Sequence, residues 1–565
     1  MGRLQPSLVV PAVVVAFVFI GYVVYPFGMT VAESLETDGG FSFSNYQQLL
    51  SPASRGHWEA VGNSVLVSLL SVVFAGILGL FFAVVFTQFD FPFKGILSGL
   101  AILPIALPPL VGVIAFMFVF GEGGIIPRLL QLLLHTEHVP VSLGGIAGIV
   151  AVHVYSFYVY FYSFASASLR QLDASLLEAA AGLGSSPWNT FRRLIIPELK
   201  PALAGASILT FMASMASFSA PFLMGGGSRF MTTQIYATKL NGEMTLAAAQ
   251  AVLLALASVA FFVGLRLMER QRSTAMRAKG AGKIRVLRVS SRWRNSFVAL
   301  SVLLLSLELL PILAIVVISF VPEGSWTWQI VPTTFSIENY SNLLGEPRVF
   351  EPVRNSLIMS GVALGAGLLI GVTAAYLVTK RVRGRAGTVM DVLLTLPFAV
   401  PGTVLAISFI LSFDHPNLFG GFTILVGTVW ILPLAYLIRT YPLITRSTAA
   451  VLENFDDSLT EAAASLGAGP FRSFGRVVLP IILPGVLSGS VLCLITTLGE
   501  FVSSILLYTY ATRPISVEIF SQLRSYNFGA AAAYSVFLIL LITCLISLSN
   551  IVLRRFSRRS EGIPL

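Results

Sequence analysis

Twelve long apolar runs divide this chain, and each is about long enough to cross a bilayer. They lie near residues 8–30, 60–87, 97–120, 144–168, 202–223, 245–267, 296–320, 354–379, 388–412, 422–440, 483–508 and 530–553. A membrane helix needs roughly 20 apolar residues, and its backbone must satisfy its own hydrogen bonds in lipid. Charged residues make up only 11% of the chain, against about 25% in soluble domains. The sequence therefore predicts an all-α membrane protein with about twelve transmembrane helices.

Basic residues mark one side of this predicted topology. The linker at 266–295 carries ten Lys and Arg residues and one acid, Glu269, and further basic clusters lie at 380–387 and in the tail. Loops of opposite parity are acidic or mixed. Because Lys and Arg in short loops mark the cytoplasmic side, we predict that both termini and the linker are cytoplasmic. We assign the net charge of +10 to topology rather than to nucleic acid; a regulatory role of the linker stays open.

The first apolar run follows Arg3 and could belong to a secretory signal. No convincing small-residue cleavage site follows it, so we predict a retained first helix. The two cysteines, Cys493 and Cys544, both lie in apolar runs. They suggest neither a disulfide framework nor a cysteine-based metal site.

One polar segment occurs twice. Glu178-Ala-Ala-Ala-Gly-Leu-Gly-Ser-Ser-Pro187 and Glu461-Ala-Ala-Ala-Ser-Leu-Gly-Ala-Gly-Pro470 are identical at seven of ten positions and lie 283 residues apart. Other matching stretches are Val61–Val65 with Val353–Leu357, Leu103–Pro108 with Leu396–Pro401, and Arg229–Ile235 with Arg513–Ile519. We predict a first half at 1–265 with its polar segment at 170–201, and a second half at 296–565 with its polar segment at 453–484.

Six spans per half is an even number, so the two halves insert in the same orientation. Parallel repeats of this kind are related by an axis along the membrane normal, and the substrate path is expected where they meet. A polar element repeated once per half also predicts a partner that comes in two copies.

Each polar segment is predicted to form a short helix, a turn and a second helix. Ala and Leu favour helix, and Gly184 is placed to end the first one. Pro187 falls at the start of the next helix, which we expect to run to Pro197. The second copy matches with Gly467, Pro470 and Pro480. Asp173 and Asp456 precede the two segments, and we expect each to cap a turn.

The pattern of the repeated segment resembles the signature of permease subunits of binding-protein-dependent ABC importers. That signature is Glu-Ala-Ala, three residues, Gly, nine residues, an aliphatic residue, one residue, an aliphatic residue and Pro. The two copies follow it with Glu178, Ala179, Ala180, Gly184, Leu194, Ile196 and Pro197, and with Glu461, Ala462, Ala463, Gly467, Val477, Leu479 and Pro480. The first copy departs slightly, since leucine is usual where Ile196 stands.

The resemblance implies a type I importer permease fold in a bacterial inner membrane. It also implies a fused permease, in which one polypeptide supplies both halves. It implies that each segment is a coupling helix docked on one of two ATPase subunits, and that a periplasmic binding protein delivers the cargo. A chain of this length looks like the ferric-iron type, with the thiamine type similar. ATP and magnesium would then belong to the partner, and this chain would hold no cofactor.

The sequence agrees with an ATPase on another chain. Its one Gly-Lys pair, Gly282-Lys283, is followed by Ile284, and no glycine stands five residues before Gly282. The phosphate cradle of a Walker A loop is therefore missing, and we expect this chain not to be an enzyme.

Ionisable residues inside a span are candidates for function. Glu500, beside Phe501, is the clearest, and its repeat partner is Ser217, beside Phe218. In the family that the chain resembles, the equivalent helix lines the path, so we take these four residues as candidates for the substrate path. Glu500 could instead pair with a neighbouring Arg, or lie near the outer surface and hold the binding protein.

Three other polar sites carry weaker signals. Glu308 is a second acid within an apolar run. Its position is explained equally well by a functional role and by peripheral packing against the second-half core. His153 stands among tyrosines and favours a satisfied polar residue over a ligand. His135 and His138 flank Glu137 and lack the further ligand that a metal site would need, so we predict no metal site.

Two rival classes are a membrane enzyme and a secondary transporter. An ion-driven carrier should show several buried acids or broken helices at matching positions. Here Glu500 has no acidic mate, and the matched features lie on the predicted cytoplasmic side. Intramembrane catalysis would need a constellation that the sequence lacks. Within the importer class, ferric iron leads, and thiamine, a phosphonate or sugar phosphate, and a polyamine remain as alternative cargoes.

Overall fold

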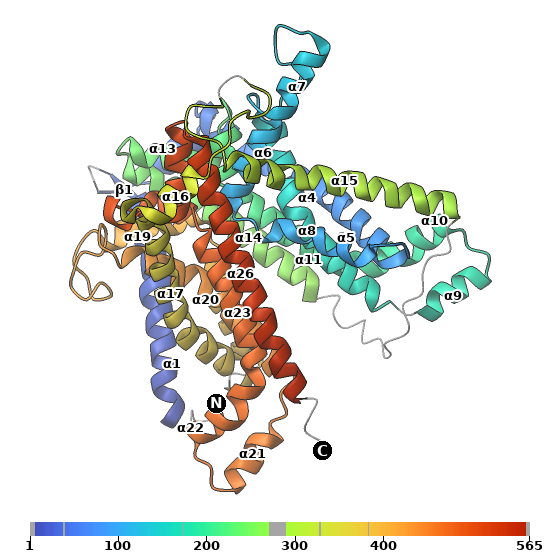
Figure 1. Cartoon of the computed structure of the whole chain (residues 1–565). Helices are drawn as coiled ribbons and strands as arrows, with labels where there is room; N and C mark the ends of the chain where they lie inside the picture. Colours follow the sequence, from blue (N-terminus) through green and yellow to red (C-terminus); the bar gives the residue numbers. More distant parts are fainter. Residues whose placement is uncertain are drawn as a thin grey trace. The chain divides into compact units, whose positions relative to one another are not determined.

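The computed structural model describes residues 6–37, 40–172, 174–270, 290–326, 329–381 and 384–560. The one sheet among these residues is a two-stranded antiparallel ribbon of β1 (Glu36–Thr37) and β2 (Gly40–Phe41), and helices form nearly all the rest (Figure 1). The all-α prediction is confirmed. Most of the basic linker at 266–295 and Asp173 lie outside the described residues.

The chain divides into two compact units, which do not coincide with the two sequence halves. The N-unit comprises Tyr46–Ala237 and Leu253–Ser336, and the C-unit comprises Met1–Asn45, Thr238–Val252 and Ile337–Leu565. The first helix of each sequence half therefore belongs to the unit that holds the rest of the other half.

The helices of the N-unit are α4 (Arg55–Gln88), α5 (Lys94–Leu100), η2 (Leu103–Ala106), α6 (Pro109–Phe120), α7 (Ile125–Leu134), α8 (Gly145–Arg170), α9 (Ala174–Gly182), α10 (Pro187–Thr190), η3 (Phe191–Ile195), α11 (Ile196–Met215), α12 (Ser219–Met224) and α15 (Ser291–Ile318). Its core is the packing of α4, α8 and α11. Helix α15 packs on α4, α5 and α6. The expectation that Glu308 packs against the second-half core is therefore wrong, because its helix lies on the first-half core.

The helices of the C-unit are α1 (Pro6–Phe19), η1 (Ile20–Val24), α2 (Tyr25–Ser34), α16 (Glu338–Gly345), α17 (Pro347–Tyr376), η5 (Leu377–Arg381), α18 (Gly384–Ala399), α19 (Gly402–Phe413), α20 (Ile431–Leu452), α21 (Ser458–Ser465), α22 (Pro470–Ser473), η6 (Phe474–Val478), α23 (Leu479–Leu498), α24 (Val502–Leu507), η7 (Tyr510–Thr512), α25 (Ile515–Arg524) and α26 (Phe528–Ser560). Helices α17, α20 and α23 form its core, α1 packs on α17, and α2 packs on α19. Helices α3 (Ser44–Leu50), α13 (Met231–Leu240) and α14 (Met244–Arg270) are divided between the units.

The cores of the two units pack by the same rule. A side chain at Gly79 would strike the backbone of Tyr158 and Phe161 Cβ, and one at Gly371 would strike Ile444 Cβ, at 2.6 and 2.9 Å from the respective Cβ atoms. Small residues let membrane helices approach closely in this way. The two glycines are matched in the repeat, as are Phe161 and Ile444, so the repeated sequence is confirmed as a repeated packing of α4 on α8 and of α17 on α20.

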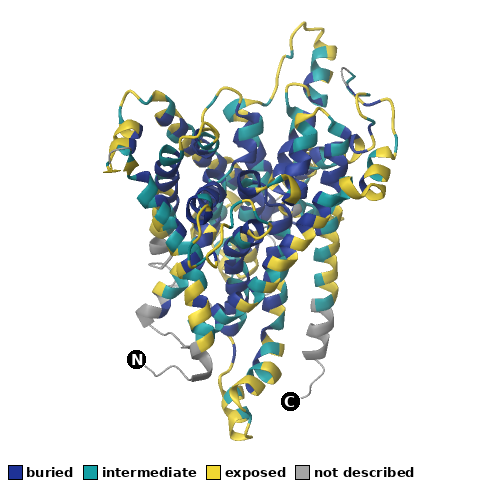
Figure 2. Cartoon of the chain, turned by 90° about the vertical axis from the view of Figure 1, so that its left-hand side faces the viewer, coloured by how far each residue is buried: buried dark blue, intermediate teal, exposed yellow. Residues whose placement is uncertain are grey.

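Within the described residues, ten helices are long and apolar enough to cross a membrane, and a bent pair gives an eleventh. The ten are Val10–Ser34, Arg55–Gln88, Pro109–Leu134, Gly145–Arg170, Pro187–Met215, Met244–Gly264, Ser291–Ile318, Pro347–Lys380, Pro470–Leu498 and Phe528–Val552. The predicted run at 422–440 corresponds to α20, which is not among them. Figure 2 shows buried residues along the packed helices and exposed residues on the segments that extend beyond them.

Two predicted runs differ from single straight helices. The run at 388–412 is broken into Val389–Ala399 and Gly402–Phe413, which meet at 95°, because Pro401 has no N–H to continue the helix. In the first half, the matching Pro108 separates η2 from α6. The run at 422–440 begins its helix only at Ile431, after three residues with positive φ at Gly421, Phe422 and Gly427.

Candidate functional site

The first of the repeated segments ends its short helix as the sequence predicts. After α9, Gly184 adopts φ +72°, and its N–H donates to Ala181 O at 3.0 Å while Ser185 N donates to Ala180 O at 3.0 Å. This pair of bonds is a Schellman motif, which satisfies the last carbonyls of a helix and favours glycine at its left-handed position.

The second copy repeats this geometry. Gly467 has φ +80°, its N–H donates to Ala464 O at 2.9 Å, and Ala468 N donates to Ala463 O at 3.0 Å. Asp456 Oδ1 accepts a hydrogen bond from Ser458 N at 2.9 Å, so the predicted turn cap before α21 is confirmed. That bond holds the pKa of Asp456 below its ordinary value.

The helix after each turn is longer than predicted. Pro187 and Pro470 do begin α10 and α22, but the helix does not stop at Pro197 or Pro480. It continues through a π-turn, η3 or η6, to Met215 or Leu498, which makes one span of 29 residues in each half. A proline inside a helix removes a hydrogen bond and clashes with the carbonyl four residues earlier. In both copies the wider π-turn ends two residues before the proline, and the span continues through the proline.

The repeated segments expose apolar side chains in matched pairs. Leu183 and Leu466 are 87% and 89% exposed, and Trp188 and Phe471 are 67% and 79% exposed. Leu176 and Leu459 form a third matched pair of exposed leucines. Glu178 and Glu461 are exposed in both copies. Figure 1 shows α9 and α21 each extending beyond the packed helices of its own unit. Exposed apolar side chains gathered on one short segment are typical of surfaces that contact another protein or a membrane.

Lys380 anchors the second segment to the end of α17. Its Nζ lies 3.0 Å from Asp457 Oδ1, donates to Phe455 O at 3.0 Å and sits 5.3 Å from the centre of the Phe455 ring. Gln88 occupies the matching position in the first half, and Ala174 matches Asp457. The anchor is thus a feature of one copy.

Replacing Lys380 with Met is expected to loosen the residues that lead into α21. The lost ion pair contributes up to about 1 kcal/mol, because Asp457 is half exposed and screened, and the lost hydrogen bond to Phe455 O contributes about 1 kcal/mol more. Hydrogen exchange should become faster at residues 453–461 and stay unchanged at the first copy. Lys380→Arg, which keeps the charge, is the control; equal exchange in the wild type and Lys380→Met would show that the contact anchors nothing.

Glu500 lies two residues beyond α23, and both of its carboxylate oxygens are engaged. Oε2 is 3.1 Å from Arg439 Nε of α20, and Oε1 accepts bonds from Ser503 N and Ser503 Oγ, each at 3.0 Å. Glu500 is 6% exposed. The pairing with an Arg that the sequence left open is therefore the arrangement in this structure, and whether the pair borders the path stays a prediction.

The other three path candidates are held inside their own units. Ser217 Oγ lies 2.9 Å from His153 Nε2. Phe218 stacks on Phe222 with ring centres 4.8 Å apart, and Phe501 packs on Phe520 at 5.5 Å. Both Phe218 and Phe501 are about 1% exposed. Their role as path-lining residues stays a prediction.

His153 is a satisfied polar residue, as the sequence favours. Besides Ser217, its Nδ1 lies 3.1 Å from Ser71 Oγ and 3.0 Å from Ser214 Oγ. The described residues contain no group of three or more His, Cys, Asp or Glu that could hold a metal. His135 ends α7 in a left-handed conformation.

The matched Asn-Ser pairs tie α4 and α17 to the loops before α13 and α25. Asn63 Nδ2 donates to Arg229 O at 3.0 Å, and Ser64 Oγ accepts from Met231 N at 3.0 Å. The second half repeats both bonds: Asn355 Nδ2 donates to Ala511 O at 3.0 Å and Arg513 O at 3.2 Å, and Ser356 Oγ accepts from Ile515 N at 2.8 Å. Two of the repeated sequence stretches thus correspond to one repeated contact.

Asn355→Ala is expected to release the loop before α25, because it leaves two carbonyl acceptors without their donor. Removing one partner of a buried hydrogen bond costs about 1–3 kcal/mol, so hydrogen exchange at residues 509–515 should rise by roughly one to two orders of magnitude. Asn63→Ala removes one bond and should have the smaller effect on residues 229–231. Equal hydrogen exchange at residues 509–515 in the wild type and Asn355→Ala would show that Asn355 does not hold this loop.

Two ion-pair residues, the half-buried Arg439 and the buried Glu518, were not found from the sequence. Arg439 lies 61 residues before Glu500, so only the packing of α20 on α23 reveals the pair. Glu518, 4% exposed, lies in α25 with its Oε2 2.9 Å from Arg513 Nη1. Arg513 belongs to one of the repeated sequence stretches. Glu518 follows it by five residues and stands between two aliphatic residues, and this position of an acid was the signal from which the pair could have been predicted.

Comparison with known proteins gives a consistent result. Residues 75–274 and 367–560 each match the family described as binding-protein-dependent transport system inner membrane component. A probable ABC transporter permease protein, y4fN, of Sinorhizobium fredii is 27% identical over 534 residues, which cover 94% of this chain and 93% of that protein. The ferric transport system permease protein FbpB of Actinobacillus pleuropneumoniae is 26% identical over 86% of this chain and 70% of its own length.

Among solved structures, the crystal structure of a bacterial ABC transporter involved in the import of alginate covers 46% of this chain and 96% of its own, with a TM-score of 0.39 and 18% identity.

The helix breaks at Pro108 and Pro401 show that matched features are not limited to the repeated polar segments, so that part of the sequence argument against an ion-driven carrier is wrong. The family match decides the class instead. With two copies of the family domain on one polypeptide, this chain belongs to the inner-membrane permeases of binding-protein-dependent ABC importers, in fused form.

Proposed function

We propose that each repeated segment of this permease docks on one copy of an ATPase subunit, and that the pair of segments drives transport of ferric iron. The observation that carries the proposal is the duplicated exposed surface: Leu183 with Trp188 in one copy, and Leu466 with Phe471 in the other. Because the surface occurs twice with matching residues, two identical partners would satisfy it. In this proposal the coupling residues are Glu178, Ala179, Ala180, Gly184 and Pro197, and Glu461, Ala462, Ala463, Gly467 and Pro480.

The continuous spans provide the route from the coupling segments to the path candidates. Pro187–Met215 and Pro470–Leu498 are each 29 residues long, or roughly 43 Å at 1.5 Å per residue. They end two residues before Ser217 and Glu500. In each half, movement of the docked segment would therefore be transmitted through a single helix. In the first half it would reach Ser217 and Phe218, and in the second half Glu500 and Phe501. Closure of the partner dimer on ATP would pull the segments together and switch the path from inward-open to outward-open.

The same arrangement supports a cytoplasmic position of both termini. Helix α1 begins and α26 ends at the end of the C-unit from which α21 extends (Figure 1). If α21 docks on a cytoplasmic ATPase, both termini share its side. ATP and magnesium are assigned to that partner, and this chain would bind no cofactor and catalyse no hydrolysis.

The cargo assignment is supported by the relative named as a ferric transport system permease. In this conformation Glu500 offers no vacant carboxylate oxygen to a cation, since Arg439 and Ser503 engage both. This supports selection of cargo by the periplasmic binding protein rather than by a charged site in the membrane. Thiamine, a phosphonate or sugar phosphate, and a polyamine are the alternative cargoes.

Uptake of radiolabelled ferric iron in cells with and without this chain tests the proposal, with Glu178→Arg/Glu461→Arg as the inactive control. Uptake that requires the intact chain supports ferric iron as cargo. Uptake that is equal with and without the chain would reject ferric iron and direct the search to thiamine and organophosphorus solutes. The importer family would be unaffected by that result.

A further inference from the structure

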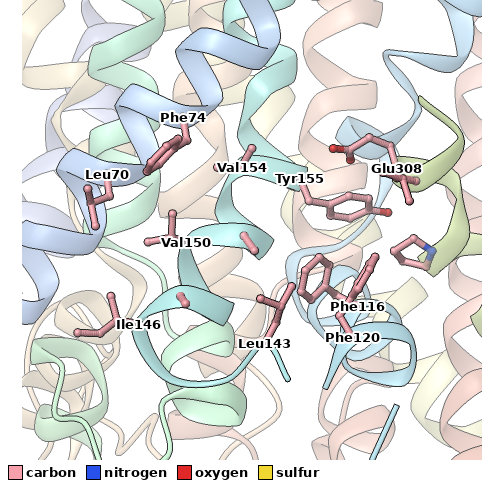
Figure 3. Close-up of a pocket in the computed structure, with 14 residues that line it drawn as sticks. Leu70, Phe74, Phe116, Phe120, Leu143, Ile146, Val150, Val154, Tyr155 and Glu308 are labelled. Carbon is pink, nitrogen blue, oxygen red and sulfur yellow. The ribbon is translucent and has the colours of Figure 1, made fainter. Parts of the chain in front are cut away.

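The N-unit contains a pocket of about 770 Å³ among α4, α6, α8 and α15 (Figure 3). Its walls are apolar, with Leu70 and Phe74 from α4, Phe116 and Phe120 from α6, and Val150 and Val154 from α8. Sites for small molecules commonly have this size and this apolar lining, together with a few polar groups that orient the ligand.

Two side chains in this lining carry a polar atom that has no hydrogen-bond partner in the part of the chain that the structure describes. Tyr155 is 3% exposed, and its hydroxyl has no hydrogen-bond partner among the described residues. The same holds for the buried Oε2 of Glu308 on α15. Both residues line the pocket (Figure 3). Buried polar groups left unpaired are costly, and an acid within a membrane span indicates a functional site.

The position of Glu308 limits what could pair with it. It lies ten residues before Ile318, the end of α15, which is roughly 15 Å along the helix and about half of the 30 Å hydrocarbon thickness. A lipid headgroup would have to leave the interface by that distance to reach the carboxylate. A free molecule in the pocket needs no such displacement.

The chemistry of the lining selects a cation with an apolar body. An anion would be repelled by Glu308. A hard metal ion needs six or more oxygen ligands, whereas the described residues contain no group of three or more potential metal ligands. A primary ammonium carries three donors, enough for the Glu308 carboxylate and the Tyr155 hydroxyl together, and an attached hydrocarbon would occupy the apolar walls.

We propose that this pocket is a binding site for a free amphiphilic amine, with Glu308 pairing its ammonium group and Tyr155 accepting a hydrogen bond from it. The proposal is independent of the cargo and of the coupling segments. Glu308 is an anchoring residue for the ligand, and the walls supplied by α4, α6 and α8 determine the size of the apolar body.

The test uses 1-adamantanamine and its neutral isostere 1-adamantanol as probes. Binding of each tritiated probe is measured by equilibrium dialysis on the purified full chain in nanodiscs of phosphatidylglycerol. The wild type should bind one amine per chain at least tenfold more tightly than the alcohol. Glu308→Gln should lose that preference and keep the alcohol affinity, and Glu323→Gln, an exposed acid of the same unit, should behave as the wild type.

Equal affinity of the wild type for the two probes, or an unchanged preference in Glu308→Gln, would overturn the proposal. If Glu308→Gln binds neither probe, Tyr155→Phe decides: weaker amine binding with unchanged alcohol binding supports the site, and unchanged amine binding overturns it. A second set of nanodiscs contains phosphatidylethanolamine. Competition by that lipid would overturn the free amine as the occupant and assign the pocket to a headgroup.

Discussion

Reversing both coupling glutamates, Glu178→Arg with Glu461→Arg, is expected to abolish transport while the membrane part stays folded. Both side chains are exposed, so the substitution removes no core contact. If each Glu pairs with a basic residue of the ATPase, truncating such an interface pair costs about 2–5 kcal/mol, and reversal adds repulsion. A loss of 2.8 kcal/mol is about a hundredfold in affinity at each segment. Co-purification of the ATPase and uptake should both fall to background.

A matched control is available eight residues before Glu461. Glu453 is exposed, and the first half carries Arg170 at the matching position, so Glu453→Arg introduces a charge that the repeat already accommodates. This variant should assemble and transport as the wild type. Normal uptake by the Glu178→Arg/Glu461→Arg variant would show that these residues do not couple the permease to its ATPase.

Arg439→Met is expected to cost more stability than the Lys380→Met or Asn355→Ala substitution. Among the described residues it leaves the buried Glu500 carboxylate with Ser503 alone as a side-chain partner. Breaking a fully buried ion pair from one side costs about 3–5 kcal/mol, which is an upper value here because Arg439 is 21% exposed. The apparent Tm of the purified chain should fall by several degrees. Arg446→Met on the same helix is the control, because the Arg446–Asp391 contact is 40% and 21% exposed at its two side chains and should contribute about 1 kcal/mol or less.

Combining Arg439→Met with Glu500→Gln separates the structural role of the pair from a role in the path. The double variant has no unpaired buried charge, so its Tm should recover most of the loss. If Glu500 borders the path, uptake should remain low although stability returns. Full recovery of uptake together with stability would remove Glu500 from the candidates for the path.

Local sequence signals predicted the repeated segments well because short-range rules govern them. Gly184 and Gly467 end their helices through bonds within five residues, and Pro187 and Pro470 begin the next helices for equally local reasons. The same local rules predicted wrongly that Pro197 and Pro480 would stop the helix. A π-turn accommodates each proline, and no pattern in the sequence alone predicted either π-turn.

Long-range packing was beyond such reasoning. Hydropathy places α1 and α15 in the membrane but does not say which core each will cover, and each joins the unit that holds the other half's helices. The partner of Glu500 is on a different helix, so periodicity could not identify Arg439. The break at Pro401 could have been predicted from the sequence, because both halves carry a Leu-Pro stretch followed by a second proline at matching positions.

The mass of the complex that this chain forms with its ATPase, measured by native mass spectrometry, tests directly whether each repeated segment docks one subunit. The wild type should carry two ATPase subunits per chain, Glu178→Arg or Glu461→Arg alone should carry one, and the double variant none. A wild-type complex with a single ATPase, or a double variant that retains both, would contradict the proposal that each repeated segment docks one subunit.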